Sequence, residues 1–138
     1  MATVVKFNTF PRDILLAVHN FNTHTFKALL TNTTPLAANT VKADISEISA
    51  GFGYSAGGVA VPCSVSLSGA TAKVTASDAT ITAAGGSIGP FRWVVMYNDT
   101  SSGDSLIGYI DYGSSISIAD GDPFILDFDS VNGLFTAA

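Results

Sequence analysis

Short runs of alternating apolar and polar residues, separated by turn-forming residues, recur along this chain and limit it to β structure. Residues 64–68 (SVSLS) and 72–76 (AKVTA) alternate on either side of Gly69-Ala70, which predicts a hairpin. Residues 79–82 form a further short alternating run. About eight such strands at this spacing predict an all-β fold, a single-domain β-sandwich that is jelly-roll-like.

The composition supports β structure and excludes several functions. The chain has fifteen Ser, fourteen Thr and thirteen Gly, but one Glu and no Gln, so residues that favour helices are scarce. Its pI of 4.5 argues against nucleic acid as a partner, because binding phosphates needs a basic surface. A single cysteine excludes a disulfide framework. No apolar run approaches the ~20 residues that span a bilayer, and residues 1–10 lack a signal-peptide pattern, so we expect no membrane partner.

The two ends of the chain differ in pattern and in charge. Residues 1–10 alternate weakly and end at Pro11, so residues 1–12 are expected to form an N-terminal arm, with residues 13–138 as the β-sandwich domain. All six basic residues precede residue 93, whereas residues 93–138 carry seven acidic residues and no Lys or Arg. Solvated turns explain this acidic third, and an acidic face for a basic partner is the alternative.

Three segments predict particular elements. Residues 13–18 fit either a short helix capped by Asp13 or a buried strand, which periodicity cannot separate. Residues 92–97 (RWVVMY) are apolar on both faces, which predicts a central strand. Residues 105–112 predict its partner, with Leu106, Gly108 and Ile110 on one face.

Residues 51–58 (GFGYSAGG) contain four glycines and two aromatics. A phosphate-binding loop needs a Gly-x-Gly-x-x-Gly pattern between a strand and a helix, and here Gly57 falls one place late. The sequence therefore predicts a sharp structural loop in which Phe52 and Tyr54 pack against the core.

No motif in the chain supports catalysis, a cofactor or a metal. His19 and His24 have no nearby cluster of ligands and are expected in loops or on the surface. Cys63 fits a small apolar filler. The one metal-like cluster is Asp120-Gly121-Asp122, which a turn explains as well as calcium does, since no Glu closes a calcium loop. We expect a protein without enzymatic activity, and the calcium question stays open.

Six short motifs in the second part of the chain form a pattern that is known from other proteins. They are residues 51–54 (GFGY), 57–58 (GG), 91–99 (FRWVVMYND), 106–113 (LIGYIDYG), 120–124 (DGDPF) and 132–135 (NGLF). Over residues 45–138, the chain resembles a family of small structural proteins in the virions of tailed bacteriophages. Members have a β-rich domain with a glycine-tyrosine loop, and capsid cement (decoration) proteins of this size often have jelly-roll folds.

The resemblance implies a cement protein on the outer capsid surface of a virion, with the major capsid protein as partner and a homo-oligomer as the expected state. The alternative is a tail or fibre component that binds a receptor or carbohydrate. A mean hydropathy of +0.39 with 12% charged residues predicts that some apolar surface is buried against a coat protein or another copy. The aromatic residues expected to make these contacts are Phe7, Phe10, Phe52, Tyr54, Tyr109 and Tyr112.

Overall fold

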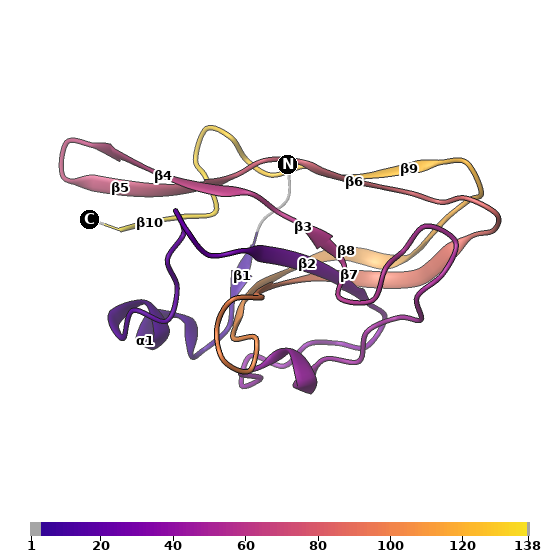
Figure 1. Cartoon of the computed structure of the whole chain (residues 1–138), viewed down its shortest axis with the longest axis horizontal. Coiled ribbons are helices and arrows are strands. Elements are labelled where there is room, and N and C mark those ends of the chain that lie inside the picture. The colour runs from indigo at the N-terminus through magenta and orange to yellow at the C-terminus, as the bar shows by residue number, and fades with distance from the viewer. Residues whose placement is uncertain (1–3, 138) are drawn as a thin grey trace.

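The chain forms two stacked layers of antiparallel β-strands in a computed structural model that describes residues 4–137 (Figure 1). The lower layer is one five-stranded sheet; its strands, in spatial order, are β1 (Val5–Lys6), β8 (Leu106–Ile118), β7 (Ile88–Asn98), β2 (Phe26–Thr31) and β3 (Val59–Ala60). The upper layer has a three-stranded sheet of β10 (Phe135–Ala137), β5 (Thr71–Ala76) and β4 (Cys63–Ser68), and a pair made by β6 (Ala79–Thr82) and β9 (Pro123–Leu126).

Helical structure is limited to two short segments among the described residues. They are the α-helix α1 (Phe10–Leu15) and a 3₁₀ turn, η1 (Lys42–Asp44). The all-β prediction is confirmed, although the split upper layer does not establish a jelly roll. The hairpin predicted around Gly69-Ala70 is present as β4 and β5, with Ser68 opposite Thr71.

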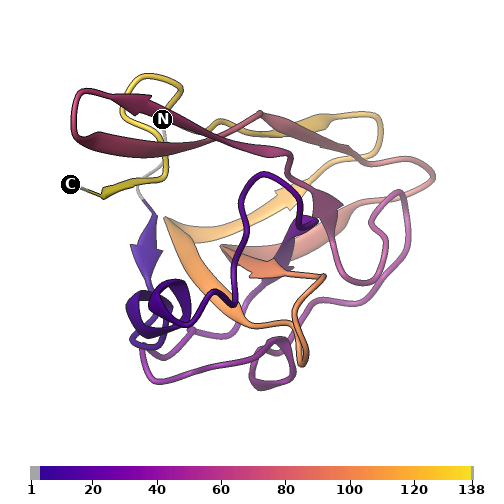
Figure 2. The ribbon, with the colours of Figure 1, turned by 60° about the vertical axis from the view of Figure 1, so that its left-hand side comes forward.

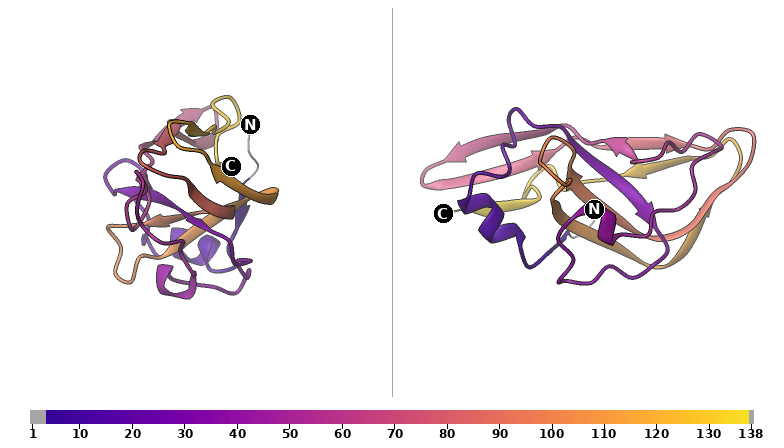
Figure 3. Two further views of the ribbon diagram at one scale, coloured as in Figure 1. Left: turned by 90° about the vertical axis from the view of Figure 1, so that its right-hand side faces the viewer. Right: turned by 60° about the horizontal axis from the view of Figure 1, so that its bottom comes forward.

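The strands β2 and β7 are buried on both faces, which the apolar run at 92–97 predicted for β7. Ala28 and Leu30 of β2 face the upper layer and join the main core, together with Val94 and Met96 of β7. Leu29 of β2 and Val95 and Tyr97 of β7 point to the opposite face of the sheet. There they form a second, smaller core together with Phe7 and Leu106. The irregular chain between β2 and β3 runs beneath this face, as Figures 1 and 3 show.

The alternation predicted for residues 105–112 holds from Gly108 to Ile110 but is wrong at Leu106, because β8 contains a bulge. Met96 lies opposite Gly108, whereas the next residue, Tyr97, lies opposite Leu106. Ile107 is therefore an extra residue, and it packs into the main core while Leu106 packs into the second core. The extra residue shifts the strand alternation by one position, so Leu106 lies on the opposite face from Gly108 and Ile110.

Residues 4–12 do not form the separate arm that the sequence suggested. Val5 and Lys6 pair with Tyr109 and Gly108 of β8, so the chain enters the fold as an edge strand. Phe7 and Phe10 are both buried, one in each core. Two buried aromatic side chains contribute several kcal/mol to stability, which anchors this segment.

The glycine-rich loop at 51–58 joins the two layers. Gly58 packs so closely on β2 that a Cβ would overlap the carbonyl oxygen of Ala28, and Gly53 similarly faces the carbonyl oxygen of Thr82 in β6. The Ala84 N–H donates to the Phe52 carbonyl at 2.9 Å. The loop is structural, as the sequence predicted.

Replacement of Gly58 by alanine tests this close approach. Gly121 is a matched control, because its φ of +86° is nearly that of Gly58 (+84°) but nothing lies within 4 Å of an added Cβ. We expect Gly121→Ala to cost about 1–2 kcal/mol of unfolding free energy from backbone strain alone. Gly58→Ala should cost about 2 kcal/mol more, because the backbone of a central strand must move. Urea unfolding measures both, and equal losses would contradict the close packing.

Candidate functional site

Three of the six aromatic residues predicted as contacts are buried inside the fold. Phe7 lies in the second core, and Phe10 and Tyr54 lie in the main core. Phe10 packs edge-on against Phe135, with ring centroids 4.8 Å apart. A surface role for these three side chains is wrong, because burying an aromatic ring removes a large apolar area from water.

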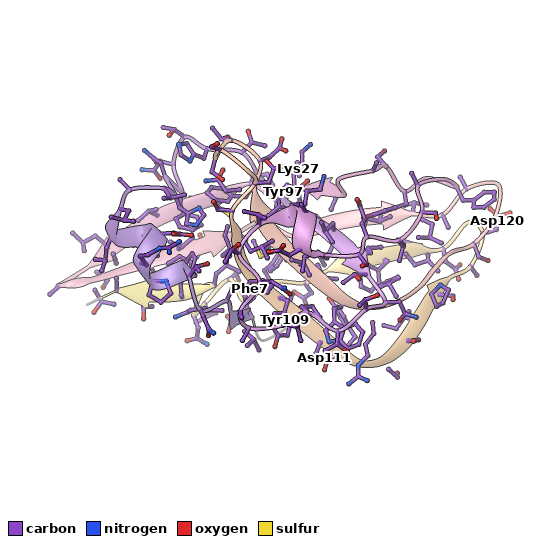
Figure 4. All side chains as sticks on the ribbon, turned by 90° about the horizontal axis from the view of Figure 1, so that it is seen from below. Phe7, Lys27, Tyr97, Tyr109, Asp111 and Asp120 are labelled. Atoms are coloured by element: carbon purple, nitrogen blue, oxygen red, sulfur yellow. The ribbon has the colours of Figure 1, made fainter. Side chains whose placement is uncertain are left out.

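Two more of the predicted contacts, Tyr109 and Tyr112, are half-buried on β8. The Tyr109 ring centroid lies 5.3 Å from that of Phe7, and the two labels lie together beneath the sheet in Figure 4. Tyr112 packs against Phe124 at 5.4 Å. Both rings therefore contribute to packing within the sheet layers. Phe52 is the one predicted aromatic that is largely exposed, at 55%, although the sequence had placed it against the core.

The exposed apolar side chains are mainly aliphatic, and α1 carries three of them. Leu15 is 85% exposed, the C-cap residue Leu16 is 66% exposed and Ile14 is 37% exposed. Beside them is a hollow of about 270 Å³ lined by Lys6, Phe10, Pro11, Ile14, Leu15, Phe135, Thr136 and Ala137. We call Ile14, Leu15, Leu16 and this hollow the apolar end.

The β4–β5 hairpin lies at the same end of the molecule as α1 and β10, as Figures 1 and 2 show from two directions. Val65 and Leu67 of β4 are 43% and 73% exposed. The sequence contained no signal for this exposure, because an apolar pair such as Leu15-Leu16 equally fits a buried segment. Exposure depends on what the rest of the chain leaves uncovered.

The helix α1 begins after Thr9 with Pro11 in its first turn, a favoured position for proline. Asp13 lies within the helix and is not its cap, which corrects the sequence prediction. The Asp13 side chain is buried and its Oδ1 accepts from Arg12 Nη2 at 2.8 Å. The Val18 N–H donates to the Asp13 carbonyl at 2.9 Å, which closes the helix towards the following loop.

That loop is held to the sheet by Asn98 at the end of β7. The Asn98 Oδ1 accepts from the N–H groups of Thr100 and Ser101, which fixes the orientation of the amide. Its Nδ2 then faces Nδ1 of His19 at 3.1 Å and Nδ1 of His24 at 2.9 Å. The same Nδ2 donates to the Val18 carbonyl at 3.2 Å, so its two hydrogens are shared among three acceptors. The bond to His19 requires Nδ1 of that ring to accept, so His19 is neutral when this bond forms.

His19 lies in a loop, which is one of the two positions expected from the sequence, but its side chain is buried. Its Nε2 has no hydrogen-bond partner among the described residues. Burial lowers the pKa of His19; the charge of Asp13 opposes this shift and that of His24 adds to it. A histidine with a lowered pKa stabilises the fold above its unfolded value of 6.5, and this stability is lost as the pH falls.

We therefore expect the protein to lose stability between pH 7.5 and 5.5, before most carboxylates titrate. Each unit by which folding lowers the pKa of His19 corresponds to about 1.4 kcal/mol. His19→Phe fits the surrounding aromatic rings and cannot take up a proton, so its unfolding free energy should change less over this range. Urea midpoints at several pH values measure the difference. An equally steep decline in the variant would exclude His19 as the cause.

A second hollow, of about 440 Å³, lies beside the glycine-rich loop. Its lining combines the exposed Phe52 ring with the polar residues Asn32, Glu47, Ser49 and Ser87. Glu47 has structural partners, because its Oε1 accepts from the Tyr54 hydroxyl and from the Gly57 N–H, each at 2.7 Å. Burial raises the pKa of Tyr54, and the charge of Glu47 adds to this, so the hydroxyl stays protonated as a donor.

Several acidic side chains of the last third bond to nearby groups. Asp120 Oδ1 accepts from the Gly85 N–H at 2.9 Å, and Asp111 Oδ1 lies 2.8 Å from Arg92 Nε. Figure 4 places Asp120 and Asp111 well apart. Within residues 4–137, no group of three or more His, Cys, Asp or Glu side chains could hold a metal ion.

Cys63 is half-buried and forms no disulfide. Burial raises the pKa of its thiol to about 11, so the thiol is protonated at neutral pH. A protonated thiol is a poor nucleophile, which agrees with the apolar filler that the sequence predicted.

No protein-family model, curated protein or solved structure matches this chain. In the part of the chain that the structure describes, neither helical segment has the length and apolar character needed to cross a membrane.

Proposed function

We propose that this chain is a non-enzymatic virion protein of a tailed bacteriophage that binds the outer capsid surface as a cement protein. The motifs in residues 45–138 that resemble small phage virion proteins support this role. The apolar end supports a binding role in particular, because Leu15 and Leu16 are adjacent, strongly exposed and held on an anchored helix. Exposed apolar surface of this kind is typical of sites for protein partners.

Stabilisation of the shell follows from binding. A protein that binds the intact shell but not its dissociated subunits stabilises the shell by RT ln(1 + [L]/Kd). Many copies add these contributions over the whole capsid. Burial of one leucine side chain contributes roughly 1.5–3 kcal/mol, so Leu15 and Leu16 would supply part of the binding free energy and further contacts around the apolar end would supply the rest.

Leu15→Asp tests the role of the apolar end. We expect about 10- to 100-fold weaker binding to capsids from which the native chain has been stripped, since one buried leucine is lost and a charge is introduced. Co-sedimentation with capsids measures the affinity, and the melting temperature of the decorated shell should fall in parallel. Ile125→Asp on β9 is the matched control, because Ile125 is 55% exposed and lies outside the apolar end.

The location of the chain in particles provides the second part of this test. Antibody labelling of intact particles should mark the capsid surface. Labelling restricted to the tail would contradict the proposal, as would capsid binding by Leu15→Asp that equals the wild type.

The hollow beside Phe52 favours a second candidate, a tail or fibre component that binds carbohydrate. An exposed aromatic ring next to amide, carboxylate and hydroxyl groups matches the chemistry of a sugar, which offers one apolar face and several hydroxyls. A glycan array tests this candidate. We expect any bound glycan to be lost in Phe52→Ala, and an array without binding would rule against it.

A further inference from the structure

The strand β4 is an uncovered edge of the three-stranded sheet, in which β5 is central. It spans six residues, whereas the other edge strands described have two to four. Val65 lies opposite Val74 and shares its face of the sheet, yet it is exposed. Val74, on the central strand β5, is buried in the main core, whereas Val65 lies one strand further out at the edge. The hairpin as a whole extends beyond the end of the five-stranded sheet (Figures 1 and 3).

The backbone of β4 has groups that point away from β5. Ser77 N–H donates to the Pro62 carbonyl at 2.9 Å, which makes these two residues a hydrogen-bonded pair. Bonded and non-bonded pairs alternate along an antiparallel ladder. Ser64, Ser66 and Ser68 therefore bond to β5, and the outward-facing N–H and carbonyl groups belong to Cys63, Val65 and Leu67.

The side chains of this edge carry no feature that blocks pairing. Natural sheets protect their edges with charged residues, proline, bulges or very short strands. Among the other edges, β1 contains Lys6, β9 begins with Pro123, and β3 has two residues. Residues 64–68 contain no charge and no proline, and read S-V-S-L-S, so the stretch is nearly symmetric about Ser66.

We propose that β4 pairs antiparallel with β4 of a second copy of this chain, with Ser66 on the two-fold axis. In this register, residues 64–68 of one copy pair with residues 64–68 of the other. Cys63, which lines a hollow together with Asn22, His24, Thr25 and Phe26, lies outside the paired stretch. Val65 of each copy lies opposite Leu67 of the other, and both exchange their outward hydrogen bonds. The two copies form one six-stranded sheet, and four exposed apolar side chains become neighbours.

The charges near the axis permit this arrangement. Lys73, opposite Ser66 on β5, is the nearest basic residue on the hairpin, and its Nζ donates to the Val131 carbonyl at 2.6 Å. In the dimer, the two Lys73 backbones lie three strand spacings apart, or about 14 Å. This exceeds the Debye length of about 8 Å at physiological ionic strength, so repulsion between them is largely screened.

The dimer does not depend on the proposed capsid role, because it is a property of the chain in solution. Sedimentation equilibrium of the full chain should give twice the 14.2-kDa chain mass at concentrations near 100 µM. A wild-type protein that stays monomeric there would overturn the inference and leave capsid binding untouched.

Val65→Pro tests the edge directly. Proline at this position removes an outward N–H and no bond to β5, so the variant should fold and remain monomeric. Thr136→Asp on β10 is the control, because it places a charge on the opposite edge of the same sheet, across from Lys73 of β5. Thr136→Asp should dimerise like the wild type. Dimerisation by folded Val65→Pro, confirmed as folded by circular dichroism, would overturn the pairing.

Disulfide trapping tests the register in a Cys63→Ala background. Ser66→Cys should cross-link readily, since residues that face each other as a non-bonded pair have Cα atoms about 4.5 Å apart, within disulfide range. Ser64→Cys should not, because the two copies of residue 64 lie four residues apart along the strands, about 14 Å. Cross-linking through Ser64 and not through Ser66 would overturn the proposed register.

Discussion

The burial of β2 and β7 on both faces determines how the rest of the chain must fold. The upper layer of strands covers one face, but Leu29, Val95 and Tyr97 on the other face are covered by irregular chain. Irregular chain leaves backbone groups without regular partners, and each buried group left unpaired costs free energy. Glu47 and two tyrosine hydroxyls supply the missing partners: Tyr54 accepts from the Leu30 N–H, and Tyr97 donates to the Gly57 carbonyl.

The local side-chain pattern was enough to predict the elements that depend on neighbours in sequence. The β4–β5 hairpin was predicted from its alternating side chains, and the central strand at 92–97 from a continuous apolar run. The second core could not be predicted, because its members Phe7, Leu29 and Leu106 are far apart in the sequence and meet only after the sheet has formed. The β8 bulge escaped prediction for a related reason: it is defined by the register with Met96 and not by the sequence of β8.

The residues predicted to contact a partner are mostly not on the surface, because they are aromatic. A small domain gains most from burying its largest apolar side chains, so Phe10 joins Phe21 and Phe135 in the core. The side chains left outside are aliphatic ones on short or projecting elements, such as Leu15 on α1 and Leu67 on β4. The composition indicated correctly that the chain has more apolar residues than its core can bury. The fold determines which of them remain exposed.

The apolar end and the free edge of β4 lie at the same end of the molecule, which has a consequence for binding strength. Pairing through β4 would join two copies at that end, so each dimer would carry two apolar ends on one rigid body. Once the first α1 is bound to a repetitive surface, the second binds at a high effective concentration, and the combined affinity can exceed that of one contact by 10²–10⁴-fold. A modest contact through each apolar end is then sufficient, provided that the spacing of sites on the partner matches the spacing of the two helices.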